Sequence, residues 1–293
     1  MTVLGETWQY ILAGVVNGAI YAVVAAGFVL IYSVTGIINF AQGEFAMVGA
    51  LTAISLLAAH WPFLLALPVS LAVTGALGGA LYWVGIRPAR DATPVTLIFI
   101  TLGMDIALRG LDLFIWGTNP YSLRSFTPGP PLHPLGGVLP TQALWVMGLA
   151  LVTAVVLQLF FRRTYLGTAV RAAMVNRVAA QLQGVRPIRF AFWSFVVAAV
   201  LGALAGIVVA PITNATYDMG LTLGLNGFVA AILGGITDVS GAIVGGFVLG
   251  ILESLAAGFI SSGWEQGIAF LLLLGVLLFR PQGLFTSGEG KRV

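Results

Sequence analysis

The sequence predicts an all-α protein that crosses a membrane many times, and its composition, its glycine content and its long apolar runs lead to this fold class. Of the 293 residues, 59% are hydrophobic and 8% are charged, and the mean hydropathy is +1.03. A soluble domain carries about 25% charged residues, so this composition fits a lipid bilayer as solvent. The 38 glycines fit as well, because small residues let membrane helices approach one another closely.

Apolar stretches long enough to cross a bilayer as helices follow one another along the chain. We expect about nine spans, within a range of eight to ten, some of them short or broken. The first stretch lacks a basic leader and a convincing cleavage site, so it is expected to remain as a span. The predicted spans cover residues 8–32, 37–58, 63–86, 94–116, 142–161, 190–212, 221–237, 241–259 and 264–279.

The distribution of basic residues predicts which ends of the spans face the cytoplasm. Residues 162–189 contain six arginines and no acidic residue, and such a loop stays on the cytoplasmic side. Alternation of the spans then places the N-terminus outside and the C-terminus inside. Residues 1–293 are expected to form a single transmembrane domain, in which 221–237 is a broken crossing rather than a re-entrant segment.

The longest segment on the predicted outer side is 117–140, which is rich in proline. Proline lacks a backbone donor and resists regular helix, so this segment is expected to be an ordered external loop. Two interpretations remain equally open. The loop is either a linker between spans or a docking surface for a partner outside the cell.

Several classes of function lack the residues that they need. The chain has no cysteine, and its two histidines, His60 and His133, have no second ligand at metal spacing. It also has no phosphate-binding G-x-x-x-x-G-K-[ST] loop, no H-E-x-x-H motif and no nucleophile elbow. We therefore expect no enzyme activity and no bound cofactor, and the net charge of +3 suggests no nucleic-acid partner.

A short helix is predicted inside the basic loop, over residues 167–184. This segment is rich in alanine, arginine, glutamine and methionine, which favour helix. Gly184 is expected to end it, with Pro187 three residues later. Helices that lie on lipid usually present large apolar side chains, whereas this one offers mainly alanine. The pattern therefore favours docking onto a protein over docking onto anionic lipid.

Four segments carry a resemblance to a known family. The loop sequence T-Y-L-G-T-A-V-R-A-A…N…A-A-Q-L-Q-G-V resembles the cytoplasmic coupling loop of LivH-type permeases of ABC importers for branched-chain amino acids. Residues 27–50, 224–254 and 277–285 are also similar to that family, in the same order. One departure is visible, because Val175 and Asn176 stand where the family carries an acidic residue.

The resemblance implies a transporter subunit with its ATPase on other chains, so ATP and Mg would bind to those partners. It also implies a second related permease subunit, two cytoplasmic ATPase subunits, an external substrate-binding protein and a location in the bacterial inner membrane. Relatives carry urea or short amides, and a stand-alone secondary transporter or channel is the remaining alternative. The residues expected to couple to the ATPase are Gly167, Arg171, Ala172, Asn176, Arg177, Ala180 and Gly184.

Five polar residues within predicted spans are candidates for the transport path or gate: Asn39, Gln42, Glu44, Asn226 and Glu253. Asn39 is expected to cap a helix that starts near Phe40, with Glu44 about one turn in, where the helix dipole favours a carboxylate. A weak internal duplication pairs Asn39 with Asn226, in two similar stretches that lead into glycine- and alanine-rich helices. The same five positions also suit a structural role.

Charged residues inside the spans are costly and need a partner. Asp105, Arg109 and Asp112 are spaced to share one helix face, which predicts an internally neutralised cluster rather than a substrate site. Glu44 and Glu253 have no basic neighbour in their own segments. The sequence therefore predicts that both are unpaired, and they are the only candidates for an ion-coupling site.

Overall fold

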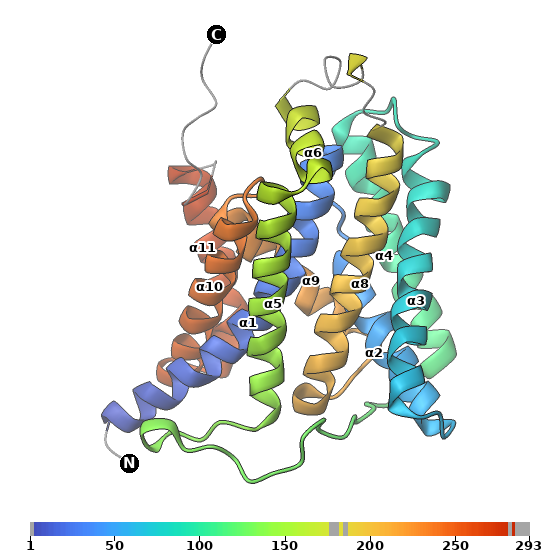
Figure 1. Cartoon of the computed structure of the whole chain (residues 1–293). Coiled ribbons are helices and arrows are strands. Elements are labelled where there is room, and N and C mark those ends of the chain that lie inside the picture. The colour runs from blue at the N-terminus through green and yellow to red at the C-terminus, as the bar shows by residue number, and fades with distance from the viewer. Residues whose placement is uncertain (1–2, 176–181, 184–186, 281–282, 285–293) are drawn as a thin grey trace.

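The computed structural model describes residues 3–175, 182–183, 187–280 and 283–284, and in these residues the chain is a bundle of helices (Figure 1). No β-sheet occurs in this part of the chain, which has two isolated β-bridges, Tyr121 with Ala215 and Leu132 with Leu139. The predicted all-α fold class is confirmed.

In the described residues, the helices follow the order of the predicted spans, and the short helix α6 follows α5. Their bounds are α1 Val3–Thr35, α2 Gln42–Ala58, α3 Phe63–Leu81 with a π-helical turn Tyr82–Ile86, α4 Pro94–Trp116, α5 Gln142–Arg163, α6 Tyr165–Val175, α8 Pro187–Thr213, α9 Met219–Gly234, α10 Val239–Phe259 and α11 Glu265–Phe279. Short 3₁₀ turns occupy Pro134–Gly136 and Ser262–Trp264.

Every predicted span is occupied by a helix, and six of these helices are long and apolar enough to cross a membrane. Those six cover Gly5–Thr35, Phe63–Ile86, Gln142–Arg163, Ile188–Thr213, Val239–Phe259 and Ser262–Phe279. The other three differ in length or charge. Helices α2 and α9 are apolar but have 17 and 16 residues, and the 23 residues of α4 include three charged side chains.

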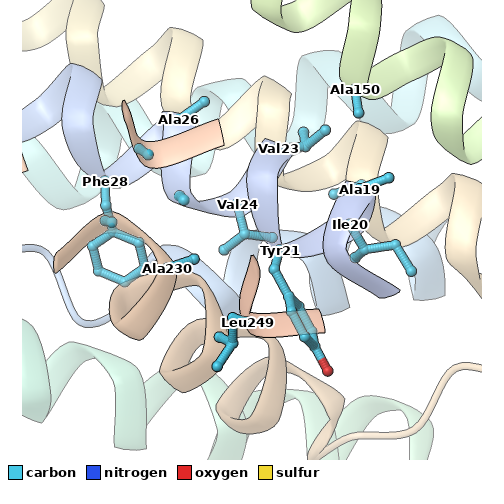
Figure 2. Packing of buried hydrophobic residues seen from close by; sticks show 14 of the residues in the cluster. Ala19, Ile20, Tyr21, Val23, Val24, Ala26, Phe28, Ala150, Ala230 and Leu249 are labelled. Atoms are coloured by element: carbon cyan, nitrogen blue, oxygen red, sulfur yellow. The ribbon is translucent and has the colours of Figure 1, made fainter. Parts of the chain in front are cut away.

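Helix α1 lies at the centre of the bundle, where it packs against α5, α8, α9 and α10. Its side chains Val24 and Phe28 belong to a buried apolar cluster that also contains Ala150, Ala230 and Leu249 from three of these neighbours (Figure 2). Because α1 begins the chain and these four neighbours lie almost entirely in the second half of the sequence, the two halves form one bundle around α1.

Glycines bring the backbones of α1 and α10 into direct contact. Gly14 and Gly18 on α1 face Gly246 and Gly250 on α10, and the members of each pair are spaced four positions apart. A Cβ placed on Gly250 would lie 2.5 Å from the Cα of Gly18. This distance is far shorter than van der Waals contact, so the observed helix separation requires glycine, as in other close-packed membrane helices.

The segment 117–140 connects α4 to α5 at the end of the bundle opposite α6 (Figure 1). Side chains near the start of α1 hold it there. Trp8 Nε1 donates to the carbonyl of Pro134 at 2.9 Å. Gln9 pairs with the backbone of Val138, accepting from its N–H at 2.7 Å and donating to its carbonyl at 3.0 Å. The start of α1 and this loop therefore lie at the same end of the bundle.

Large apolar side chains cover the outside of the bundle. Leu64 on α3, Phe114 on α4 and Phe279 on α11 are each at least 85% exposed. In water such residues would be unfavourable, whereas in a bilayer they contact lipid or a neighbouring subunit. The distribution of exposed side chains agrees with the composition in identifying a membrane protein.

Candidate functional site

The first turns of the two short helices α2 and α9 meet inside the bundle. Gly43 of α2 packs so tightly on α9 that a Cβ on Gly43 would lie 2.6 Å from the Cα of Gly224. Gly220, in the first turn of α9, lies beside the Glu44 carboxylate, whose Oε2 would be 2.5 Å from a Cβ at that position. One carboxylate therefore lies near the N-terminal ends of both helices, where their dipoles favour negative charge.

The prediction that Asn39 caps α2 is wrong. The helix begins at Gln42, its N-cap residue is Ala41, and no side chain makes the capping hydrogen bond. Asn39 takes part through its backbone, since its carbonyl accepts from the Gln42 N–H at 3.1 Å in a turn before the helix. Its side chain is 1% exposed, and both its Nδ2 and Oδ1 are without a hydrogen-bond partner in the described residues.

Glu44 forms an ion pair with Arg109 of α4, so the prediction that Glu44 is unpaired is also wrong. Arg109 Nη2 donates to Glu44 Oε1 at 3.0 Å and to Asp105 Oδ2 at 2.8 Å. The Glu44 side chain is fully buried and that of Arg109 is 23% exposed. The partner of Glu44 comes from a helix 65 residues further along the chain, which spacing within α2 does not reveal.

The charged cluster on α4 is neutralised only in part. The predicted pair of Asp105 and Arg109 is present, but Asp112 is 3% exposed and its Oδ2 has no hydrogen-bond partner in the described residues. The Nε of Arg109 is also buried without a partner there. With Glu44, the cluster combines one guanidinium with three carboxylates, and in the described residues Arg109 Nε, Asp112 Oδ2 and Glu44 Oε2 remain without a hydrogen-bond partner.

Gln42 connects α2 to the helices on its other side. Its Nε2 donates to the backbone carbonyl of Ala198 on α8 at 3.0 Å, while its Oε1 is buried without a partner in the described part of the chain. The side chain fits because Gly27 of α1 has no Cβ, which would otherwise overlap the Gln42 amide. Gln42 therefore fixes the start of α2 against α1 and α8.

A second buried polar group joins three helices. Tyr21 of α1 lies beside Glu253 of α10 and Asn226 of α9. Glu253 is 0% exposed, and both its carboxylate oxygens lack a hydrogen-bond partner in the described residues. Asn226 lies within α9, whereas Asn39 precedes α2, so the two asparagines do not occupy equivalent positions.

The predicted coupling loop begins with a sharp connection between α5 and α6. Thr164 ends α5, and its Oγ1 donates to the Phe160 carbonyl at 2.6 Å and accepts from the Gly167 N–H at 3.0 Å. Gly167 packs against the backbone of Phe160 and Phe161, where a Cβ would overlap. This contact aligns the first turn of α6 with the end of α5.

The described part of the predicted coupling helix is α6, which begins at Tyr165, two residues before the predicted start. Arg171 and Ala172 are exposed on it. The other predicted coupling residues lie outside the described residues: Asn176, Arg177, Ala180 and Gly184. Val170 turns inward and is 3% exposed, so α6 presents one face to the bundle and another to its surroundings.

Sequence reasoning missed the involvement of Arg109 and Tyr21. Arg109 offered a signal, because it is the single basic residue of the predicted span 94–116, and a charge in such a position indicates function by default. Because Asp105, four residues earlier, already offers Arg109 an ion-pair partner, the sequence did not predict a pairing with Glu44. Tyr21 offered no signal, since a tyrosine in an apolar helix is ordinary.

Apolar helices that enclose charged and amide side chains define a polytopic membrane protein. Among the described residues, no group of three or more metal-ligating side chains could hold a metal ion. Residues 10–278 match the family described as the permease component of branched-chain amino acid transport systems. The chain belongs to this family of ABC-type permeases.

Relatives of known name agree with this family. The chain is 29% identical to the high-affinity branched-chain amino acid permease LivH of Escherichia coli, over 97% of both chains. It is 30% identical to the permease BraD of Pseudomonas aeruginosa, again over 97% of both. The ribose import permease RbsC of Haemophilus influenzae is 25% identical over 92% of this chain and 84% of its own.

A solved structure shares the fold. PsaBC from Streptococcus pneumoniae, in complex with a Fab, aligns with a TM-score of 0.53 over 94% of this chain and 93% of its own. The two sequences are 12% identical. At this identity, the likeness describes the fold alone and carries no information about the substrate.

Proposed function

We propose that this chain is the membrane-spanning permease subunit of an ATP-driven importer for branched-chain amino acids in the bacterial inner membrane. The observation that carries the proposal is the match to LivH and BraD over 97% of the chain, because it includes the loop, the spans and their order. Separate ATPase subunits, a second permease subunit and an external binding protein complete the proposed transporter.

The proposed contact with the ATPase is the end of the bundle that carries α6. Arg171 and Ala172 are exposed there, and Gly167 locks the start of α6 onto the end of α5. A rigid link of this kind transmits a push on α6 directly to a helix that spans the bundle. The opposite end, with the segment 117–140 held by Trp8 and Gln9, is the proposed docking side of the binding protein.

We place the transport path beside the meeting point of α2 and α9. In many transporters, substrate sites are formed where interrupted helices end inside the membrane. Here the first turns of two short helices meet, and the partly exposed Arg109 lies beside them. Its guanidinium is the group in this cluster that could receive the carboxylate of an amino acid, while Asn39, Gln42 and Glu44 line the same region. Glu253 and Asn226 form a second polar position in the interior.

Uptake by reconstituted vesicles tests the proposed function. We expect the purified chain, assembled with its ATPase subunits and binding protein, to accumulate leucine, isoleucine or valine only when ATP and Mg²⁺ are supplied on the ATPase side. Vesicles that receive a non-hydrolysable ATP analogue provide the control. Uptake by the chain alone, driven by an ion gradient, would show a secondary transporter, and selective uptake of urea, a short amide or ribose would correct the substrate.

Reversal of charge on α6 tests the coupling role. We expect Arg171→Glu to lower ATP-driven uptake about tenfold while the chain still inserts and purifies, because coupling free energies between sites are typically of this size. Uptake and ATP hydrolysis are measured on the same vesicles. The matched control is Arg90→Glu, which makes the same charge change at another exposed arginine. Equal losses in both variants would contradict a specific contact at α6.

A further inference from the structure

A cavity of about 340 Å³ lies between the end of α3 and the start of α8. Two arginines, Arg87 and Arg189, line it together with the aromatic side chains of Trp83, Tyr82 and Trp193. The guanidinium of Arg87 stacks over Trp83, 3.6 Å from the ring centroid. Basic and aromatic groups therefore face one space that the proposed transport function does not use.

The cavity lies where two spans end. Arg87 directly follows the candidate span Phe63–Ile86, and Arg189 is the second residue of the candidate span Ile188–Thr213. Trp83 and Trp193 are 53% and 60% exposed. Tryptophan gathers at the level where a bilayer meets water, because its ring is apolar and its N–H is polar. The cavity is thus at the depth of lipid headgroups.

Its charge is positive and uncompensated. Among the described residues, no acidic side chain lines the cavity, and neither Arg87 nor Arg189 forms an ion pair. The hydroxyl of Tyr82 donates to the carbonyl of Ile188 at 3.3 Å and ties the two helices together between the arginines. Two guanidinium groups therefore line one cavity, and arginine binds phosphate through paired N–H groups.

An apolar cavity of about 200 Å³ lies next to the basic one. Trp193 lines both cavities, and the second is otherwise surrounded mainly by apolar side chains of α1, α5, α6 and α8, among them Leu30, Val156 and Val197. A basic site and an apolar groove on two sides of one exposed tryptophan suit a molecule with a phosphate at one end and a hydrocarbon chain at the other.

We propose that the basic cavity binds the headgroup phosphate of an anionic phospholipid, with an acyl chain in the adjacent apolar groove. An acidic segment of a cytoplasmic protein would also be attracted to two arginines. The exposed tryptophans and the apolar groove have no use in that contact, whereas a phospholipid occupies all three features. Basic sites between membrane helices are known to hold anionic headgroups in this way.

The experiment compares lipids on the purified full-length chain in detergent. Phosphatidylglycerol or phosphatidylcholine is added at equal concentration, bound lipid is counted by native mass spectrometry, and the thermal unfolding midpoint is recorded. We expect retained phosphatidylglycerol and a raised midpoint with this lipid alone. Inorganic phosphate and glycerol phosphate, at the same concentration, separate a phosphate site from a lipid site. If inorganic phosphate or glycerol phosphate raised the unfolding midpoint as much as phosphatidylglycerol does, the proposal would be overturned.

Two charge-matched double variants locate the site. We expect Arg87→Gln with Arg189→Gln to weaken phosphatidylglycerol binding on the order of tenfold. Arg162→Gln with Arg163→Gln removes the same charge from the last turn of α5 and should leave binding unchanged. Equal weakening in both would mean general attraction to the basic end. Unchanged lipid binding with loss of an ATPase subunit would assign the arginines to a protein contact. Either result would overturn the proposal.

Discussion

Replacement of Gly250 by leucine is expected to prevent a stable bundle from forming. A Cβ at this position would lie 2.5 Å from both the Gly18 Cα and the Gly14 carbonyl oxygen of α1, and backbone atoms do not yield to a side chain. Helices α1 and α10 would have to separate along the glycine contact. Overpacking a close-packed interior costs about 1–3 kcal/mol, and a backbone overlap at the central helix belongs at or above the upper end.

The measurement is the thermal unfolding midpoint and the monodisperse fraction of the purified chain in detergent. Gly148→Leu is the matched control, because a Cβ on Gly148 of α5 would meet nothing within 4 Å. Gly250→Ala should fall between the control and Gly250→Leu. If Gly250→Leu behaved like Gly148→Leu, then α1 and α10 would not be in backbone contact. The placement of α1 at the centre of the bundle would then be wrong.

Helix positions followed closely from the sequence, because the bilayer imposes them. Every backbone polar group must be satisfied within the span, so apolar runs of sufficient length become helices whatever their neighbours. The predicted stretches 63–86 and 94–116 therefore coincide with α3 plus its π-helical turn and with α4. The same rule recognised α2 and α9 as present. It predicted a broken crossing over 221–237, whereas α9 is one continuous short helix, Met219–Gly234, and the rule said nothing about where α2 and α9 meet.

The start of α2 could not be predicted because tertiary packing decides it. Asparagine is a preferred N-cap, and this preference placed the start near Phe40. In the structure, Asn39 is buried in the turn before the helix, and the helix begins where Gly43 can rest on α9 and Gln42 can reach Ala198. A local preference of about 1 kcal/mol is easily outweighed by contacts of this kind.

Two contacts between distant parts of the sequence could not be predicted either: the glycine contact of α1 with α10, and the ion pair of Glu44 with Arg109. Spacing by four residues is visible at Gly14 and Gly18 and at Gly246 and Gly250, but with 38 glycines in the chain it does not single out these two pairs. Likewise, the sequence shows that Glu44 and Arg109 are both costly inside a membrane, but it cannot join residues on α2 and α4. Only the packing of the bundle selects the partners.

Removal of Arg109 has the second large effect that we expect. In Arg109→Leu, the carboxylates of Glu44 and Asp105 lose their shared counter-charge inside the bundle. Breaking a buried pair by removing one partner costs about 3–5 kcal/mol, and the partial exposure of Arg109 favours the lower end of this range. We expect a lower unfolding midpoint and no uptake of amino acid. Glu44→Gln should retain most of the stability, since Arg109 keeps Asp105, and should still lose uptake.

A neutral triple variant separates the structural role of this cluster from a role in transport. Arg109→Leu combined with Glu44→Gln and Asp105→Asn leaves no charge among the three positions, so none of them holds a buried charge without its counter-charge. If the cluster only holds α2 against α4, the triple variant should recover both the fold and the uptake. Our placement of the transport path demands a different result, in which the unfolding midpoint recovers and the uptake does not. The guanidinium would then be needed by the substrate and not by the bundle, and the meeting point of α2 and α9 would lie on the path.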